Sequence, residues 1–318
     1  MPSDSVATID RGRAVLESLL ANLERVIVGK RSVIELSAAV LAASGHLLLT
    51  DVPGVGKTML GRAMARSIGG TFKRVQCTPD LLPSDITGGM VYDAGHAGFR
   101  FVPGPLFANV VLADELNRTT PRTQAAFLEA MDEGQVTADG TAYPLPRPFF
   151  LIATLNPLEH HGTYPLPEGE LDRFLASASL GYLTVAEEAE MVARQQHSHP
   201  VDQLRAVTEP AQVIEVQDAV RGVRVDPSLM TYAVEIVAAT RDRSEVLIGG
   251  SPRASLGLVR LAQARSLLFG RAYVLPDDIK ELAGYVLPHR LVMRRGGEAA
   301  RGLVQEILAS APVPVTSR

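Results

Sequence analysis

Residues 46–58 of the chain read HLLLTDVPGVGKT. The first five, from His46 to Thr50, form a short apolar run with the length and composition of a buried parallel strand. The glycine-rich GVGKT at residues 54–58 follows, and a helical pattern begins at Met59. A glycine-rich turn between a strand and a helix presents successive backbone N–H groups that can cradle a phosphate. The stretch therefore predicts a phosphate-binding loop.

The side chains of this loop have distinct expected roles. Lys57 would reach the β- and γ-phosphates of a nucleotide, and Thr58 would bind Mg²⁺. Asp51 departs from the general pattern, which has glycine there, but it stands at the strand end, away from the cradle. A glycine-rich turn with an exposed lysine is the alternative, and it leaves the flanking strand and helix unexplained. The residues expected to contact the nucleotide are Pro53, Gly54, Val55, Gly56, Lys57, Thr58 and Met59.

Two further apolar runs, residues 110–113 and 149–154, alternate with helical segments. This alternation is typical of a parallel sheet with helices on its faces. Beyond about residue 180 such runs cease and helical patterns dominate. We therefore expect an α/β/α sandwich over residues 1–200, which includes an N-terminal helix, and a smaller all-helical domain over residues 201–318.

Two inserts in the first domain predict β-hairpins. Residues 89–102 alternate around the turn-rich DAGHAG at 93–98, and residues 135–145 bracket the turn signal Asp139-Gly140. Hairpins that are added to an α/β core usually project from it.

Polar side chains follow two of the expected strands. Asp114 and Glu115 come directly after residues 110–113, and Asn156 follows residues 149–154. The carboxyl ends of parallel strands meet at the edge where such sheets bind ligands. Asp114 could hold the Mg²⁺ shell, Glu115 could polarise an attacking water, and Asn156 could position that water. Taken alone, a solvated strand end and an Asn-Pro turn would account for the same residues.

Composition narrows the function classes. The 318 residues carry 31 basic and 35 acidic side chains, and a net charge of −4 argues against a chain that coats phosphate backbones. The single cysteine, Cys77, excludes an internal disulfide and is interpreted as an inert core thiol. His160 and His161 lack partners at metal-ligand spacing and are interpreted as loop histidines. Neither a signal peptide nor a membrane span is evident, so we expect a cytoplasmic protein.

Several blocks, taken in order, resemble the AAA+ ATPases and, within them, the MoxR family. The blocks are VIVGK at 26–30, DVPGVGKT at 51–58, VVLADELNR at 110–118, ATLNP at 153–157, TYPLPEGELDRF at 163–174 and GGSPRA at 249–254. The resemblance covers nearly the whole chain and implies an AAA+ P-loop sandwich followed by a lid, with ATP and Mg²⁺ as cofactors. It identifies residues 89–102 with the helix-2 insertion and 135–145 with the hairpin before sensor 1.

The resemblance also assigns site residues. Lys57 corresponds to the Walker A lysine, and Asp114 with Glu115 to the Walker B carboxylates. Sensor 1 falls on Asn156. Arg173 is placed like the arginine finger, which reaches a neighbouring subunit's γ-phosphate, and the alternative is a surface pair with Asp172 or Glu170.

Two further roles come from the same comparison. Arg253 matches sensor 2 at the start of a lid helix, and a basic residue at a helix end is the alternative. Backbone near Val28 and Gly29 is expected beside the adenine.

The function that the resemblance implies is ATP hydrolysis by a hexameric, ring-forming, chaperone-like remodeller of partner proteins. The partner could carry a von Willebrand factor A domain, and no specific nucleic acid is expected. Tyr92, Phe99 and Phe101 in the first insert are candidate partner contacts. The alternatives are a magnesium-chelatase-like motor subunit, a DNA-acting motor, and a nucleotide-gated binding protein that does not hydrolyse.

Overall fold

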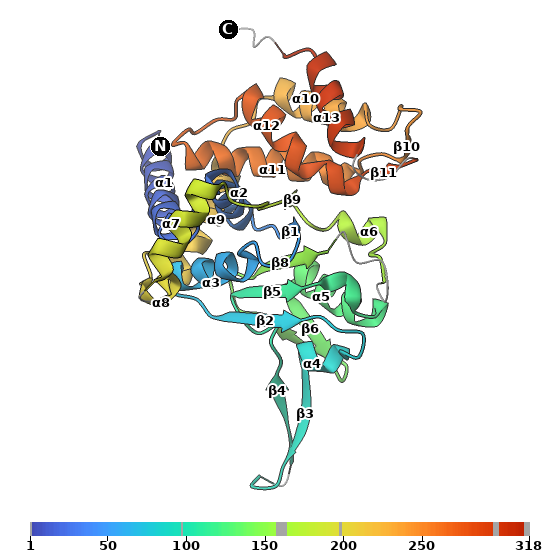
Figure 1. Cartoon of the computed structure of the whole chain (residues 1–318). Coiled ribbons are helices and arrows are strands. Elements are labelled where there is room, and N and C mark those ends of the chain that lie inside the picture. The colour runs from blue at the N-terminus through green and yellow to red at the C-terminus, as the bar shows by residue number, and fades with distance from the viewer. Residues whose placement is uncertain (1, 97, 157–163, 197–198, 295–298, 315–318) are drawn as a thin grey trace.

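A computed structural model describes residues 2–96, 98–156, 164–196, 199–294 and 299–314 of the chain (Figure 1). These residues form a layered α/β body, a helical lid that packs on one end of it, and a long hairpin that projects from the opposite end.

The body is built on a five-stranded parallel sheet with the strand order β2-β5-β8-β1-β9. The three central strands are buried along almost their whole length, which explains why they read as continuous apolar runs in the sequence. The strands are β1 (Leu47–Thr50), β2 (Phe72–Gln76), β5 (Val110–Asp114), β8 (Phe150–Leu155) and β9 (Ala176–Ala178).

Helices cover both faces of this sheet. Alternate residues of a strand point to opposite faces, so Leu47 and Leu49 pack with α1 (Pro2–Glu24), α2 (Arg31–Ala42) and α3 (Lys57–Ser67). Leu48 points the other way and packs with residues of α4 (Pro83–Thr87) and α5 (Pro121–Glu133). The expected α/β/α sandwich is confirmed.

Both predicted hairpins are present. Strands β3 (Gly88–Asp93) and β4 (Gly98–Pro103) pair antiparallel and extend away from the body (Figure 1), and β6 (Gln135–Ala138) pairs with β7 (Thr141–Pro144). The longer hairpin stands on a tight base, where a Cβ on Gly88 would lie 2.1 Å from the carbonyl oxygen of Val102. Only glycine fits at that position.

The lid consists mainly of helices that begin with proline. Proline at the first helical position lacks only an N–H that would have no partner inside the helix. The helices are α9 (Pro210–Gly222), α10 (Pro227–Ala238), α11 (Pro252–Leu268) and α12 (Pro276–Val286), and they are followed by η2 (Pro288–Arg290) and α13 (Ala299–Ser310).

The lid also contains a short antiparallel strand pair, β10 (Val246–Ile248) with β11 (Val292–Met293), which the expectation of an all-helical lid did not include. Strands of three and two residues are too short to produce a detectable alternation. The segment between body and lid contains α7 (Val185–Gln195) and α8 (Pro200–Gln203), and a short helix, α6 (Glu168–Leu171), precedes β9.

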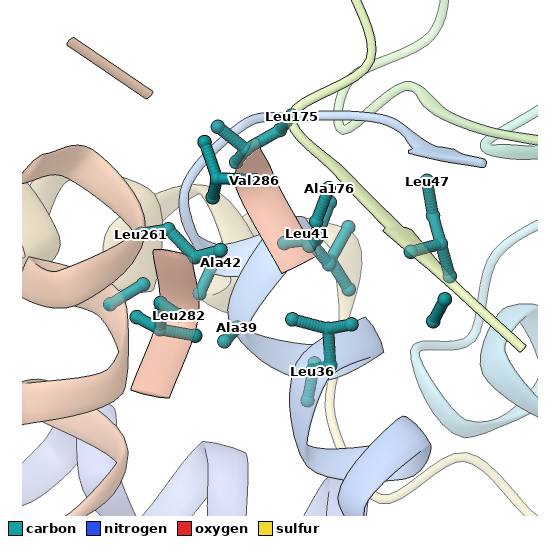
Figure 2. Packing of buried hydrophobic residues seen from close by; sticks show 14 of the residues in the cluster. Leu36, Ala39, Leu41, Ala42, Leu47, Leu175, Ala176, Leu261, Leu282 and Val286 are labelled. Atoms are coloured by element: carbon teal, nitrogen blue, oxygen red, sulfur yellow. The ribbon is translucent and has the colours of Figure 1, made fainter. Parts of the chain in front are cut away.

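Lid and body share one hydrophobic cluster. Figure 2 shows Leu261, Leu282 and Val286 of the lid around Ala42 of α2, with Leu175 beside them. Because one continuous core spans both parts, the lid packs on the body as part of the same folded unit. A domain boundary at residue 200 stays a prediction. Among the described residues, no helix combines the length and the apolar character needed to cross a membrane.

Candidate functional site

The predicted phosphate loop lies between β1 and α3. Gly54 and Gly56 have φ angles of 87° and 101°, which glycine adopts without strain. A Cβ on either residue would meet no atom within 4 Å, so open space lies over the loop. Lys57 is the first residue of α3 and is buried, and its Nζ donates a hydrogen bond to the carbonyl oxygen of Asp51 at 3.1 Å.

Asp51 has a structural role that accounts for its departure from glycine. Its buried carboxylate accepts hydrogen bonds from Ser179 Oγ at 2.6 Å, from the Leu180 N–H at 2.6 Å and from the Gly181 N–H at 3.0 Å. These bonds fasten the start of the loop to the segment that follows β9. The sequence pattern contained no indication of this contact.

The carboxyl ends of three neighbouring strands converge beside the loop. Thr50 of β1 pairs with Leu155 of β8, and Ala113 of β5 pairs with Ala153 of β8. This register places Asn156, which is buried, in line with the start of the loop and with the end of β5. The predicted Lys57, Asp114 and Asn156 therefore approach one edge of the sheet.

The two carboxylates at the end of β5 differ in environment. Asp114 is buried, and its Oδ1 accepts a hydrogen bond from Thr154 Oγ1 at 2.8 Å. Glu115 is half-buried and has a φ of 61°, which is uncommon for a residue other than glycine and typical of functional sites. Its backbone N–H donates to the same Thr154 hydroxyl at 2.7 Å, so one threonine orients both acidic residues.

Sequence reasoning missed three polar side chains around these carboxylates. Arg74 of β2 donates to Asp114 Oδ2 from its terminal nitrogen at 2.6 Å and from Nε at 3.2 Å. Gln76 and Arg118 both donate to Glu115 Oε2, at 3.1 and 2.9 Å. Arg74 and Gln76 alternate on an exposed edge strand, a pattern that resembles ordinary surface residues and therefore carried no signal.

The two arginines that the sequence singled out lie together. Arg173 donates to Asp132 Oδ2 at 2.5 Å, and a terminal nitrogen of Arg253 lies 3.8 Å from the same oxygen. Arg173 also has a buried Nε without a hydrogen-bond partner among the described residues. In place of the alternative pair with Asp172, Arg173 pairs with Asp132, and Asp172 pairs with Arg290. Burial raises the pKa of Glu170, and nearby Arg173 opposes that shift.

The expected adenine segment lies against α7. Val28 is buried, and Gly29 has a φ of 69°. A Cβ on Gly29 would lie 2.1 Å from Glu187 Oε1, so the Glu187 side chain of α7 packs directly over this glycine. Lys30 adds a hydrogen bond from Nζ to the Tyr182 carbonyl oxygen at 2.8 Å. The segment before α2 and the segment that leads into α7 are thereby held together.

The remaining candidates are of three kinds. Cys77 is buried, and burial raises its pKa to about 12, with Asp114 and Glu115 adding to the shift, so the interpretation as an unreactive core thiol is confirmed. Tyr92 and Phe99 are exposed, whereas Phe101 stacks on Tyr143 with ring centroids 3.8 Å apart. His160 and His161 lie outside the described residues.

The described residues fit Mg²⁺ and a nucleotide phosphate. The open, glycine-lined loop at the start of α3 offers backbone N–H groups to an anion. Thr58 and Asp114 offer the oxygen ligands that Mg²⁺ prefers, and this ion commonly uses only one or two protein oxygens together with phosphates and waters. Within the described ranges no cluster of three His, Cys, Asp or Glu side chains suits a metal ion.

Comparisons with known proteins agree with this geometry. A family model described as "ATPase family associated with various cellular activities (AAA)" matches residues 46–176, and a model of the AAA lid domain matches residues 238–310. The chain is 41% identical to the protein "Chaperone MoxR1" of Mycobacterium tuberculosis (strain ATCC 25618 / H37Rv), over 87% of this chain and 76% of that protein.

Two further relatives match over almost their whole length. The chain is 50% identical to YeaC of Bacillus subtilis (strain 168), over 95% of each chain. A crystal structure of a protein from Cytophaga hutchinsonii ATCC 33406 that is assigned as an ATPase superposes with a TM-score of 0.91 at 35% identity. The match covers 98% of this chain and 99% of that one.

Proposed function

Because the chain belongs to the MoxR family of AAA+ ATPases, we propose that it hydrolyses ATP between neighbouring subunits of a ring and remodels partner proteins with that cycle. The observation that carries this proposal is the convergence of the phosphate loop, the Asp114–Glu115 pair and Asn156 at one sheet edge, while Arg173 and Arg253 share Asp132.

The residues at the sheet edge divide the work of hydrolysis. The loop from Pro53 to Met59 would hold the phosphates, with the Lys57 ammonium facing the β- and γ-phosphates. Thr58 and Asp114 would bind Mg²⁺, which neutralises phosphate charge when bound. Glu115 would orient the attacking water and accept its proton.

Asn156 and Thr154 complete this arrangement. Asn156 would hold the water in line with the γ-phosphate. The Thr154 hydroxyl bonds the Asp114 carboxylate and the Glu115 backbone N–H, and so holds the Asp114 side chain beside the backbone that carries Glu115.

Arg173 and Arg253 are proposed to act on the nucleotide of the neighbouring subunit. An arginine that reaches the γ-phosphate stabilises charge that develops during transfer. The shared contact with Asp132 supports a joint role, because it places the two guanidinium groups side by side. The buried Nε of Arg173, which has no hydrogen-bond partner within the described ranges, supports it as well, because an unsatisfied buried donor is a feature that a catalytic role would explain.

The finer aspects of the assembly are proposals of the same kind. We propose a hexamer, a location in the cytoplasm, and a protein partner that carries a von Willebrand factor A domain. A relative that is 41% identical is named "Chaperone MoxR1", and this name favours the remodelling of partner proteins over the role of a chelatase motor subunit. A switch without turnover would need neither Glu115 nor Arg173, so their presence at the site favours hydrolysis.

The test is the solution mass and phosphate release of Glu115→Gln, with and without Mg·ATP, beside Glu115→Gln/Arg173→Ala. We expect Glu115→Gln to lose about 10²- to 10⁴-fold in turnover while it still binds ATP, since that range is typical of a lost general base. ATP should drive Glu115→Gln to the mass of six subunits, and Arg173→Ala should weaken that assembly.

Two outcomes would contradict the proposal. A protein that binds ATP but stays monomeric throughout would exclude a site completed by a neighbouring subunit. Equal, near-zero phosphate release by the parent and Glu115→Gln would instead identify a nucleotide-gated switch.

A further inference from the structure

Asp172, the residue before Arg173, joins the lid to the body through both oxygens of its carboxylate. Oδ1 accepts a hydrogen bond from Arg290 Nε at 2.8 Å, and Oδ2 accepts one from Ser251 Oγ at 2.7 Å. Arg290 ends η2, and Ser251 caps α11, so one carboxylate receives bonds from two separate elements of the lid.

Arg290 binds the backbone around Arg173 as well as the Asp172 side chain. Its guanidinium donates to the carbonyl oxygens of Asp172 at 3.1 Å, Phe174 at 2.6 Å and Leu175 at 3.2 Å. The same group donates to the carbonyl oxygen of Val286 in α12. The backbone carbonyls on both sides of Arg173 are therefore held by one lid side chain.

This arginine is deeply buried, with 5% of its surface exposed. Burial lowers the pKa of Arg290, and the Asp172 carboxylate opposes that shift. A buried charge is tolerated only when it is paired and when its donors are satisfied, and the contacts to Asp172 and the carbonyl oxygens meet both conditions. Figure 2 shows Leu175 and Val286, whose carbonyls both accept from Arg290, at the junction between lid and body.

The second arm of Asp172 leads to Arg253. Ser251 Oγ accepts a hydrogen bond from the Arg253 backbone N–H at 3.0 Å while it donates to Asp172. Two hydrogen bonds thus connect the residue beside Arg173 to the backbone of Arg253. At the side-chain level Asp132 contacts both guanidinium groups, so the two arginines are connected at both ends.

We propose that Asp172 and Arg290 are positioning residues that hold Arg173 and Arg253 as one rigid pair, so that both reach the neighbouring subunit's nucleotide together. This inference rests on the proposed function, because it requires both arginines to act on the neighbour's site. A displacement of about 1 Å at a catalytic group can lower a rate by about 100-fold. Loss of the contacts made by Asp172 and Arg290 would therefore lower turnover in the next subunit and leave nucleotide binding in their own subunit unchanged.

The experiment uses Asp172→Asn, alone and mixed 1:1 with Glu115→Gln. Alone, Asp172→Asn should lose about 10- to 100-fold in kcat, with the Kd for a fluorescent ATP analogue within about twofold of the parent. In the mixture, Glu115→Gln cannot hydrolyse but presents intact arginines to its neighbour. Turnover should then rise above the sum of the two separate proteins, towards about a quarter of the parent's rate per subunit if neighbours assort at random around a head-to-tail ring.

Two matched controls separate this inference from the proposed function. Arg173→Ala mixed with Glu115→Gln should recover in the same way, and its failure to recover would reject action in a neighbouring subunit. Asp218→Asn removes an exposed aspartate that lies 3.0 Å from Arg221, and it should keep the parent's turnover. If Arg173→Ala recovers while Asp172→Asn either keeps full turnover or stays inactive in the mixture, the positioning role is wrong.

Ser251 provides a milder test, because loss of Asp172 leaves the buried Arg290 charge uncompensated and could unfold the lid. Ser251→Ala removes only the arm that leads to Arg253, and kcat should fall several-fold with KM unchanged. Ser251→Thr keeps the hydroxyl and should restore the parent's kcat. Equal kcat for Ser251→Ala and the parent would overturn the connection between Asp172 and Arg253.

Discussion

The junction between lid and body and the β3–β4 hairpin show opposite uses of apolar side chains. At the junction, Leu261, Leu282 and Val286 are buried in a cluster that continues into the sheet (Figure 2). On the hairpin, Tyr92 and Phe99 are 58% and 68% exposed. Because the junction is closely packed, a movement of the lid would also move the helices of the body that it contacts. The exposed side chains of the hairpin have few neighbours, so substitutions there should cost little stability.

The contacts that the described residues of the hairpin make with the β6–β7 hairpin lie near its base. Phe101 stacks on Tyr143 of β7 with an interplanar angle of 9°, while Tyr92 and Phe99 contact each other across the strands with ring centroids 5.5 Å apart. The outer half of the hairpin therefore rests on its own cross-strand pairs. We therefore expect substitutions at the junction to lower the free energy of unfolding most, and substitutions in the outer hairpin to lower it least.

Leu261→Ala, at the junction, should have the largest effect on stability. Leu261 is fully buried in the shared cluster, and loss of a buried leucine costs about 2–5 kcal/mol. Calorimetry should show one transition at a lower temperature, because lid and body unfold together. Leu256→Ala lies on the same helix at 73% exposure and should leave the transition unchanged. A separate early transition of the lid in Leu261→Ala would contradict a continuous core.

His46, which directly precedes β1, should make the stability of the body depend on pH. Its Nδ1 accepts the Leu151 N–H at 3.0 Å and its Nε2 bonds the Met131 carbonyl at 3.1 Å, which requires the neutral ring. Burial lowers the pKa of His46 from 6.5 to about 4, and the hydrogen bond to the Met131 carbonyl and then the Asp132 charge oppose this shift. The unfolded chain therefore binds a proton between pH 6.5 and 4 that the folded chain does not. About 3 kcal/mol of stability, present above pH 6.5, should be lost as the pH falls towards 4.

Urea unfolding at pH 7.5, 6 and 5 measures this loss, with His46→Asn as the comparison. The asparagine amide can replace one acceptor and does not titrate, so the free energy of unfolding should fall less steeply in that variant. His289 is half-buried and desolvation lowers its pKa, so a residual slope of the same sign should remain. Identical slopes in both proteins would remove His46 as the cause.

The fold of the body could be predicted from the sequence because its central strands are apolar along their length and are followed by chemically distinctive residues. It was insufficient where elements are short: β9, β10 and β11 have three residues or fewer, below the length at which periodicity can be recognised. The rule that the carboxyl ends of parallel strands share one edge led us to expect Asp114 and Asn156 near the loop, and the register of β1, β5 and β8 brings the ends of these strands together. No local pattern indicated that Arg74 would bind Asp114.

Long-range ion pairs were beyond sequence reasoning for a physical reason. Arg173 was weighed against its neighbours Glu170 and Asp172, yet it pairs with Asp132, which is 41 residues away. Asp172 pairs with Arg290, 118 residues further along the chain. Charged residues are numerous and chemically alike, so the choice of partner depends on tertiary packing: on how α5 lies beside the segment before β9 for Asp132, and on how the lid packs on the body for Arg290.

Phe101→Ala tests the base of the hairpin and should have an intermediate effect. The stacked pair with Tyr143 contributes about 0.5–1.5 kcal/mol beyond the area it buries. Hydrogen exchange should show faster opening of the β3 and β4 amides, with the β5 amides unchanged. Equal acceleration in β5 would mean that the hairpin and the sheet open as one unit. Tyr143→Ala should reproduce the same local effect.

Tyr92→Thr together with Phe99→Thr should have the smallest effect. Threonine keeps the strand preference, and both side chains are mostly exposed, so the free energy of unfolding should change by less than about 1 kcal/mol. Basal ATPase activity should match the parent's, because the pair lies outside the sheet edge that holds the nucleotide residues. If a partner protein binds the outer hairpin, this variant should keep its basal turnover and lose the stimulation of turnover by that partner. A larger loss of stability would mean that the outer hairpin packs like the junction, and the contrast between the two regions would then be wrong.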